Sequence, residues 1–227
     1  MFTAPRKFMG TGVLPGLMLS GVMLSGLMLS GCGGEEEEET SEMNASDTLI
    51  VIPDTLTLIP EASIVIDGND DDWAGVDAVM TDASGDAAYG GLDVTSLYLA
   101  QDSDALYLRL DLVSAVRPAE ESYNYWVYFE NDDGYEFAVE HYHDSQSTPY
   151  IRLWDITGAD RNYDAQTELT TLSAHTSGSV MEVQIPKSQI STSLNYRVDF
   201  YTHHTVDQTW YSNGDDADEY AYVQFSE

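Results

Sequence analysis

The chain has 227 residues, with 40 acidic side chains against 8 basic ones, a formal net charge of −32 and a single cysteine. This charge excludes binding to nucleic acid, because that affinity comes from Lys and Arg side chains that neutralise phosphates and release counterions, and an anionic lipid surface is an equally poor partner. One cysteine also excludes an intrachain disulfide and multi-cysteine zinc sites. Hydrophobic residues make up 43% of the chain and aromatic residues 11%, which is enough to build a core.

Residues 1–31 have the pattern of a secretory signal peptide. Arg6 and Lys7 precede an apolar stretch that carries no further charge until Glu35. The stretch ends in Leu29-Ser30-Gly31-Cys32, which resembles a bacterial lipobox. This resemblance implies lipid modification of Cys32 and a lipid-anchored protein of the outer membrane or cell surface, which touches the membrane only through its acyl chains. The alternative is an uncleaved transmembrane anchor, for which the apolar length suffices.

Residues 32–47 are expected to form a flexible acidic tether. The five adjacent carboxylates of Glu35–Glu39 repel one another, and the surrounding polar residues offer nothing to bury. A calcium-buffering tract or an export signal is the functional alternative to this spacer.

Residues 48–227 are expected to form one β-sandwich domain of jelly-roll or immunoglobulin-like type, which makes the fold class all-β. Short apolar runs of period two alternate with Asp, Asn, Gly or Ser turns, and no long window keeps a helical period. The predicted strands cover 63–67, 97–101, 106–111, 123–130, 135–142, 149–156, 169–173, 180–185, 196–203 and 219–225. Single helical turns are expected within 72–79 and 186–190.

One segment resembles a known family. The run Ile64-Val65-Ile66-Asp67-Gly68-Asn69-Asp70-Asp71-Asp72-Trp73-Ala74-Gly75, followed by a predicted hairpin over 92–110, resembles the opening of carbohydrate-binding family 9-like domains. These domains share a β-sandwich with the DOMON domains. The resemblance implies a non-catalytic module that binds sugars or polysaccharide ends, commonly with structural calcium, and in which the tryptophan of the motif is a core anchor.

Two groups of side chains are candidate calcium ligands. The first has the alternate spacing found in calcium loops, and the second consists of acids that neighbouring turns can bring together. Ca²⁺ takes six to eight oxygen ligands and relieves the repulsion between carboxylates. The alternative is that these side chains only satisfy turn backbone or face solvent. The two groups are Asp67, Asn69 and Asp71, and Asp93, Asp102 and Asp104.

Aromatic side chains next to polar ones are candidate sugar contacts. A flat ring packs against the C–H face of a pyranose while neighbouring polar groups bind its hydroxyls. The alternative is that these rings form a second buried layer of the sandwich. The predicted ligand-binding residues are Trp126, Tyr128, Arg152, Trp154 and Trp210.

Other chemistry is less favoured by the sequence. His141 and His143 share one face of a predicted strand and are a candidate transition-metal pair. Because DOMON relatives can hold haem between Met and His, Met80 or Met181 with His141, His175 or His203 is the basis of an alternative haem or electron-transfer function. A purely structural envelope lipoprotein is a third possibility. No hydrolase elbow, phosphate loop or metalloprotease motif is present, so no enzyme is expected.

Overall fold

The computed structural model describes residues 56–116, 122–131, 136–143, 149–159, 161, 163–206, 209–211, 215–217 and 219–226. The predicted signal peptide, Cys32 and the acidic tether lie outside the described residues. Within the described ranges, no helix is long and apolar enough to cross a membrane.

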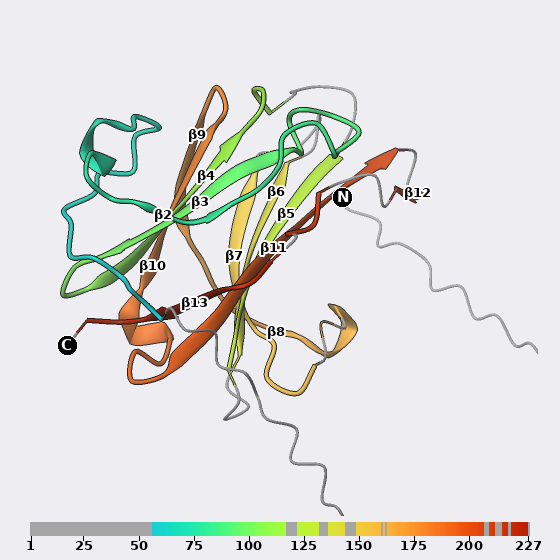
Figure 1. Cartoon of the computed structure of the whole chain (residues 1–227). Helices are drawn as coiled ribbons and strands as arrows, with labels where there is room; N and C mark the ends of the chain where they lie inside the picture. The colour runs from blue at the N-terminus through green and yellow to red at the C-terminus, as the bar shows by residue number, and fades with distance from the viewer. Residues whose placement is uncertain are drawn as a thin grey trace, which may run out of the picture. The chain divides into compact units, whose positions relative to one another are not determined.

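Two β-sheets form the domain (Figure 1). The larger sheet has eight strands, and all its pairs are antiparallel except β1 with β13. In spatial order they are β1 (Thr57–Leu58), β13 (Ala221–Gln224), β11 (Asn195–Val206), β5 (Ser122–Glu130), β6 (Phe137–His143), β7 (Tyr150–Asp155) and β8 (Thr167–Thr171), while β12 (Thr209–Tyr211) pairs with β11.

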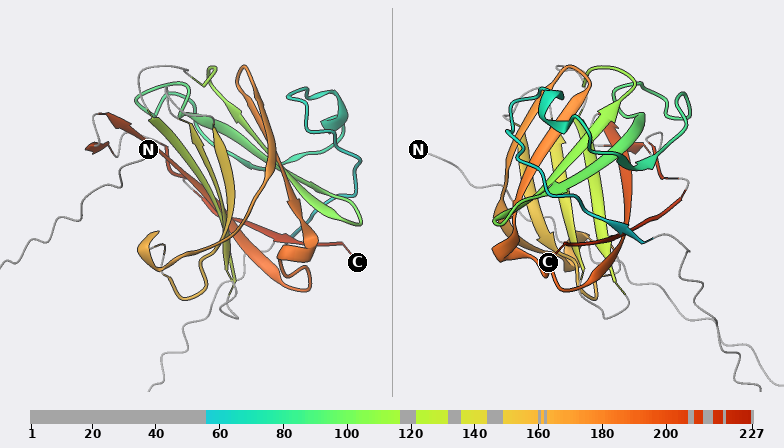
Figure 2. Two further views of the ribbon diagram at one scale, coloured as in Figure 1. Left: turned by 180° about the vertical axis from the view of Figure 1, so that it is seen from behind. Right: turned by 60° about the vertical axis from the view of Figure 1, so that its left-hand side comes forward.

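The smaller sheet has five antiparallel strands. Their order is β2 (Ala78–Thr81), β3 (Val94–Gln101), β4 (Ala105–Leu112), β10 (Val180–Pro186) and β9 (Ser173–Ser177). Figure 2 shows this sheet lying against the larger one. Helical structure within the described ranges consists of three single turns, η1 (Asp71–Trp73), η2 (Tyr163–Ala165) and η3 (Lys187–Gln189).

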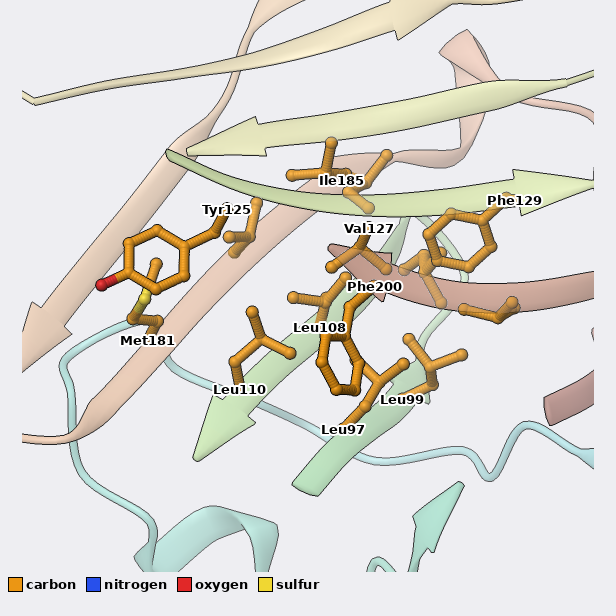
Figure 3. Packing of buried hydrophobic residues seen from close by; sticks show 14 of the residues in the cluster. Leu97, Leu99, Leu108, Leu110, Tyr125, Val127, Phe129, Met181, Ile185 and Phe200 are labelled. Carbon is orange, nitrogen blue, oxygen red and sulfur yellow. The ribbon is translucent and has the colours of Figure 1, made fainter. Parts of the chain in front are cut away.

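The core lies between the two sheets and follows from the period-two pattern, because alternate side chains of every strand point to the same face. Leu97, Leu99, Leu108 and Leu110 of the smaller sheet meet aromatic and β-branched side chains of the larger one (Figure 3). From the larger sheet, the labelled side chains are Tyr125, Val127, Phe129 and Phe200. The prediction of an all-β sandwich is therefore confirmed.

The predicted strands agree with the observed ones within a few residues, apart from 63–67, which is wrong. That segment forms no strand, and only Glu61 makes an isolated bridge to Gln101. The reason is that backbone N–H groups of 63–67 donate to side-chain carboxylates and not to a neighbouring strand. The Val65 N–H donates to Asp72 Oδ2 at 2.6 Å, and the Asp67 N–H donates to Glu182 Oε2 at 3.0 Å.

Residues 62–76 pack on the outer face of the smaller sheet and are held there by Glu182 of β10. This carboxylate is fully buried. Its Oε2 accepts the N–H groups of Asp67 and Gly68, and its Oε1 accepts the Trp73 indole N–H at 2.6 Å. Trp73 packs with Ile64 and Tyr107. The expectation that Trp73 is a core anchor is confirmed by its burial.

The close approach of this loop to the smaller sheet requires a glycine at position 68, and replacement of Gly68 tests that requirement. Gly68 has φ +79°, and a Cβ there would lie 2.4 Å from Ser177 Cβ and 2.6 Å from His175 Cδ2. We expect Gly68→Ala to lower the free energy of unfolding by at least about 2 kcal/mol, from backbone strain plus the clash. Urea unfolding of both proteins measures this change.

Gly75→Ala is the matched control, since Gly75 has φ +90° with no atom within 4 Å of a built Cβ. It should cost only about 1 kcal/mol of left-handed strain. Equal losses in the two variants would show that the contact with Ser177 and His175 contributes nothing.

Candidate functional site

The outer face of the larger sheet carries most of the predicted ligand-binding residues. Strand register places Trp126 opposite Glu140, and Glu140 opposite Arg152. The same face includes Tyr128 next to Ala138, and Ala138 next to Trp154. Strand pairing therefore brings these predicted side chains together on one face. Trp210 belongs to β12, but its side chain lies outside the described residues.

Part of this face is covered. Trp126, Tyr128 and Trp154 are only 4%, 6% and 7% exposed. They pack as one cluster with Ala138, Ile156 and Ala159. The Trp126 and Tyr128 rings are stacked, with centroids 5.7 Å apart and an interplanar angle of 9°. The three rings thus form a second buried layer of the sandwich, which was the alternative to a sugar-binding surface. Their role in binding stays a prediction, now limited to the atoms that a ligand can reach.

The Arg161 side chain lies over the covered part of this sheet face. Its guanidinium lies 4.1 Å from the Tyr128 ring centroid, while Nε donates to Glu130 Oε1 at 2.8 Å and Nη2 donates to Asp199 Oδ2 at 2.7 Å. Arg197 donates to the other Glu130 oxygen at 2.5 Å. Burial favours a higher pKa for the Glu130 carboxyl, but the hydrogen bonds from both arginines bring it below its ordinary value. These ion pairs hold the segment around Arg161 over the ring stack.

Glu140 is the polar centre of the face. Its side chain is 1% exposed, and its oxygens accept hydrogen bonds from Asn124 Nδ2 and Trp154 Nε1, both at 2.9 Å. Burial raises the pKa of the Glu140 carboxyl, and the two hydrogen bonds oppose this shift. Glu140 thereby fixes the indole of Trp154 and supports the strand pair β6–β7.

The exposed part of the face follows β6 and β7. Tyr142, Tyr150 and Arg152 are partly exposed. The two tyrosine rings are stacked with centroids 4.9 Å apart, and the Arg152 guanidinium lies 3.9 Å from the Tyr150 centroid and 5.7 Å from that of Trp154. We call Tyr142, Tyr150, Arg152 and Trp154 the β6–β7 strip. Neither Tyr142 nor Tyr150 is among the ligand-binding residues predicted from the sequence, although both follow from the alternation around Glu140 and Arg152.

The predicted calcium ligands do not converge in the structure. Asp67 Oδ1 accepts the Asn69 N–H at 2.9 Å, which is a turn contact, and Asn69 and Asp71 are exposed. Asp93 is buried, and its Oδ2 accepts the N–H of Gly85 at 2.7 Å. Across the described acidic and histidine residues, no three of the predicted ligands lie within 4.8 Å of one another. Calcium at these residues stays a prediction that the geometry does not favour.

Asp102 and Asp104 form an ordinary turn. Asp102 Oδ1 accepts the N–H groups of Asp104 and Ala105 at 2.8 Å, and Oδ2 accepts the Tyr107 hydroxyl at 2.6 Å. The Tyr107 hydrogen bond is the main cause of a lowered pKa of the Asp102 carboxyl. These donors bind both carboxylate oxygens of Asp102 and stabilise the hairpin between β3 and β4.

A cavity of about 610 Å³ opens beside the histidine pair of β6. His141 and His143 line it together with Val116, Ile151 and Thr176, among others. His141 Nε2 lies 3.2 Å from Thr176 Oγ1. Burial lowers the pKa of His141 to about 4, and His143 contributes to this shift. The two imidazoles share a face, as expected, while metal binding by them stays a prediction.

The positions of the candidate haem ligands reduce the number of Met–His pairs that could hold a haem. Met80 and Met181 are buried in the core between the sheets. Strand pairing places His203 opposite Asn124 and His175 opposite Glu182, on the outer faces of the two sheets, whereas His141 lies opposite the core residue Tyr125. Met181 and His141 both adjoin Thr176, one through strand pairing and one through its side chain. Nothing in this arrangement selects haem.

Known proteins are only distantly similar. No protein-family model matches the chain, and no curated protein matches it. Among solved structures, the chain is similar to a carbohydrate-binding module of family 9 from Caldicellulosiruptor kristjanssonii in complex with cellotriose, with 12% sequence identity and a TM-score of 0.38. The match covers 76% of this chain and 94% of that one. We transfer neither residues nor ligand from so distant a similarity, and it does not place the chain in that family.

The buried His141 predicts an acid-sensitive stability. Its folded-state pKa of about 4 lies below the ordinary value of 6.5, so the unfolded chain takes up a proton first as the pH falls. This contribution is present above about pH 6.5 and is lost progressively towards pH 4. From about pH 7 to about pH 5, wild type should lose about 2 kcal/mol more than His141→Gln.

Urea unfolding at the two pH values measures this difference. His175→Gln, on the outer face of β9, is the control and should lose stability as wild type does. An identical pH dependence in wild type and His141→Gln would contradict the assignment.

Proposed function

We propose that the domain is a non-catalytic module that binds a glycan through the β6–β7 strip. The observation that carries this proposal is the packing of Arg152 against Tyr150 and Trp154 on a partly exposed strand face. Sugar sites combine aromatic surface with a few polar groups that fix orientation. The strip offers both on two adjacent strands.

Arg152 is suited to bind sugar hydroxyls. A guanidinium has five donors in a fixed plane, and stacking on Tyr150 limits its motion before any ligand arrives. Its ion pair with Glu168 is 3.5 Å long, and the Arg152 side chain is 28% exposed. The donors are therefore not locked into a short internal hydrogen bond with that carboxylate. The hydroxyls of Tyr142 and Tyr150 add further donors and acceptors.

The charge of the chain restricts the glycan. A net charge of −32 repels anionic polysaccharides, and each like charge that is brought close to the strip costs binding free energy. The proposed ligand is accordingly a neutral oligosaccharide or polysaccharide.

Replacement of the strip tests this function. We expect wild type to bind at least one neutral polysaccharide in a pull-down or glycan array. Tyr150→Ala and Arg152→Ala should each weaken that binding by about tenfold or more, because each removes a contact of about 1–2 kcal/mol. Isothermal titration with a soluble oligosaccharide from the same polysaccharide gives the change in Kd.

Tyr220→Ala is the matched control, because the exposed Tyr220 also lies under an arginine, with Arg197 Cζ 4.5 Å from its centroid, but outside the strip. It should leave the Kd unchanged. Failure of wild type to bind any neutral glycan, or equal loss in Tyr220→Ala, would overturn the proposal.

We further propose that the full chain is a lipoprotein anchored at Cys32 in the outer membrane or at the cell surface. The support is the lipobox-like Leu29-Ser30-Gly31-Cys32 after an uncharged apolar stretch. Acyl chains would supply the anchoring, with about 0.8 kcal/mol for each buried methylene.

Expression of the full chain in a bacterium with lipoprotein processing tests the anchor. Wild type should incorporate labelled fatty acid and sediment with membranes, while Cys32→Ser should incorporate none. Equal labelling of the two proteins would contradict lipidation at this residue.

A further inference from the structure

A carboxylate lies beside the β6–β7 strip at a point where strand pairing is irregular. β8 pairs with β7 at the edge of the larger sheet, and Arg152 lies opposite Thr171. The register then shifts, so that Trp154 lies opposite Glu168 and Leu169 is left out of the pairing. A regular register would put Leu169 opposite Trp154 on this outer face. The bulge instead puts a carboxylate next to the arginine, and β-bulges commonly re-aim side chains at sheet edges and binding sites.

The gap between Arg152 and Glu168 has the size of a bridging hydroxyl group. Arg152 Nη1 and Glu168 Oε2 are 3.5 Å apart, which is longer than the N–H···O distance of about 2.7–3.2 Å. A hydroxyl oxygen can lie about 2.8 Å from both atoms at once, accepting from Nη1 and donating to Oε2. The two side chains are 28% and 41% exposed, so a ligand can reach this gap.

The other guanidinium donors suit a second hydroxyl next to the first. A guanidinium presents five N–H groups in one plane, and its fork matches pairs of oxygens that lie close together. The Arg152 guanidinium packs 3.9 Å from the centroid of the Tyr150 ring, which restricts its plane. Hydroxyl oxygens on neighbouring ring carbons therefore fit the fork better than oxygens on alternate carbons.

We propose that Arg152 and Glu168 together bind a vicinal diol of the glycan, an inference that rests on the proposed function. One hydroxyl bridges the two side chains, and its neighbour accepts from the remaining Arg152 donors. Internal hexopyranose units of 1,4-linked and 1,6-linked polysaccharides keep neighbouring free hydroxyls, whereas those of 1,3-linked polysaccharides do not. A site built to hydrogen-bond a hydroxyl rejects ligands that lack it. The ligand is accordingly a chain that carries free vicinal diols along its length.

An ordinary surface ion pair is the alternative explanation of the contact. In that case Glu168 only competes with the ligand for Arg152, as exposed ion pairs contribute little by themselves. The two roles have opposite consequences. Removal of a competing carboxylate tightens glycan binding, whereas removal of a hydroxyl acceptor weakens it.

The choice of polysaccharide tests the diol. Wild type is incubated with 1,4-linked mannan, 1,6-linked dextran and 1,3-linked curdlan in pull-downs. It should bind mannan or dextran at least about tenfold more tightly than curdlan. Binding of curdlan as tight as that of the better of the other two would overturn the diol while leaving the proposed function in place. Absence of binding to all three would also overturn the diol, and the glycan array then shows separately whether the proposed function fails.

Glu168→Ala tests the role of the carboxylate. Isothermal titration with a hexasaccharide of the preferred polymer should show a Kd raised by about tenfold or more, because a hydrogen bond to a charged acceptor is lost. Glu168→Gln keeps an uncharged acceptor and should lose less. An unchanged or lower Kd in Glu168→Ala would identify Glu168 as a bystander or a competitor and overturn the proposal.

Glu219→Ala is the matched control, because Glu219 is an exposed glutamate outside the strip. It should bind the hexasaccharide as wild type does. Because Glu168 is exposed on an edge strand, its variants should also keep the Tm of wild type, which separates a lost contact from a lost fold. Equal weakening in Glu219→Ala and Glu168→Ala would show a general charge effect and overturn the assignment.

Discussion

The buried carboxylate of Glu182 is the contact on which the arrangement around the smaller sheet depends. A charged group inside a protein is tolerated only when hydrogen bonds replace its water. Glu182 accepts the N–H groups of Asp67 and Gly68 and the indole N–H of Trp73. These three hydrogen bonds offset the free-energy cost of burying the carboxylate, and they attach the loop to the sheet. Those attachments bring the acidic loop onto the outer face, where Trp73 fills the space against Tyr107. Asp67-Gly68 and Trp73 thus bind the same carboxylate from two places in the loop.

The same contact explains what the sequence could and could not predict. Strands such as β3–β5 were predictable because alternation within eight or nine residues indicates which side chains face the core between the sheets. The segment 63–67 has a similar local pattern, but its backbone donors are taken by Asp72 and by Glu182, which is more than 100 residues away. The meeting of Asp82, Asp86 and Asp215 was equally out of reach of the sequence, because only the fold brings these three carboxylates together.

The outer face of the larger sheet shows how far aromatic patterning can mislead. Alternation along β5 puts Trp126 and Tyr128 on one side of the sheet, but it carries no information on what covers them. Arg161 and Ala159 arrive from a loop after β7 and convert exposed rings into a buried layer. The surface that remains for a ligand lies towards Tyr142 and Tyr150, at the other end of the same strands. Strand patterns predict the face, whereas loops determine which part of that face is accessible.

The scarcity of basic residues strengthens the assignment of Arg152. Arg109, Arg161, Arg197 and Lys187 each donate to a protein acceptor at 2.5–2.8 Å. Arg152 differs from these four, because its ion pair with Glu168 is 3.5 Å long and its strongest contacts are with aromatic rings. In a chain with so few cations, an arginine that packs on two rings and makes only a long ion pair keeps donors for a partner. That availability, rather than the number of aromatic rings on the face, is the reason to expect binding at the β6–β7 strip.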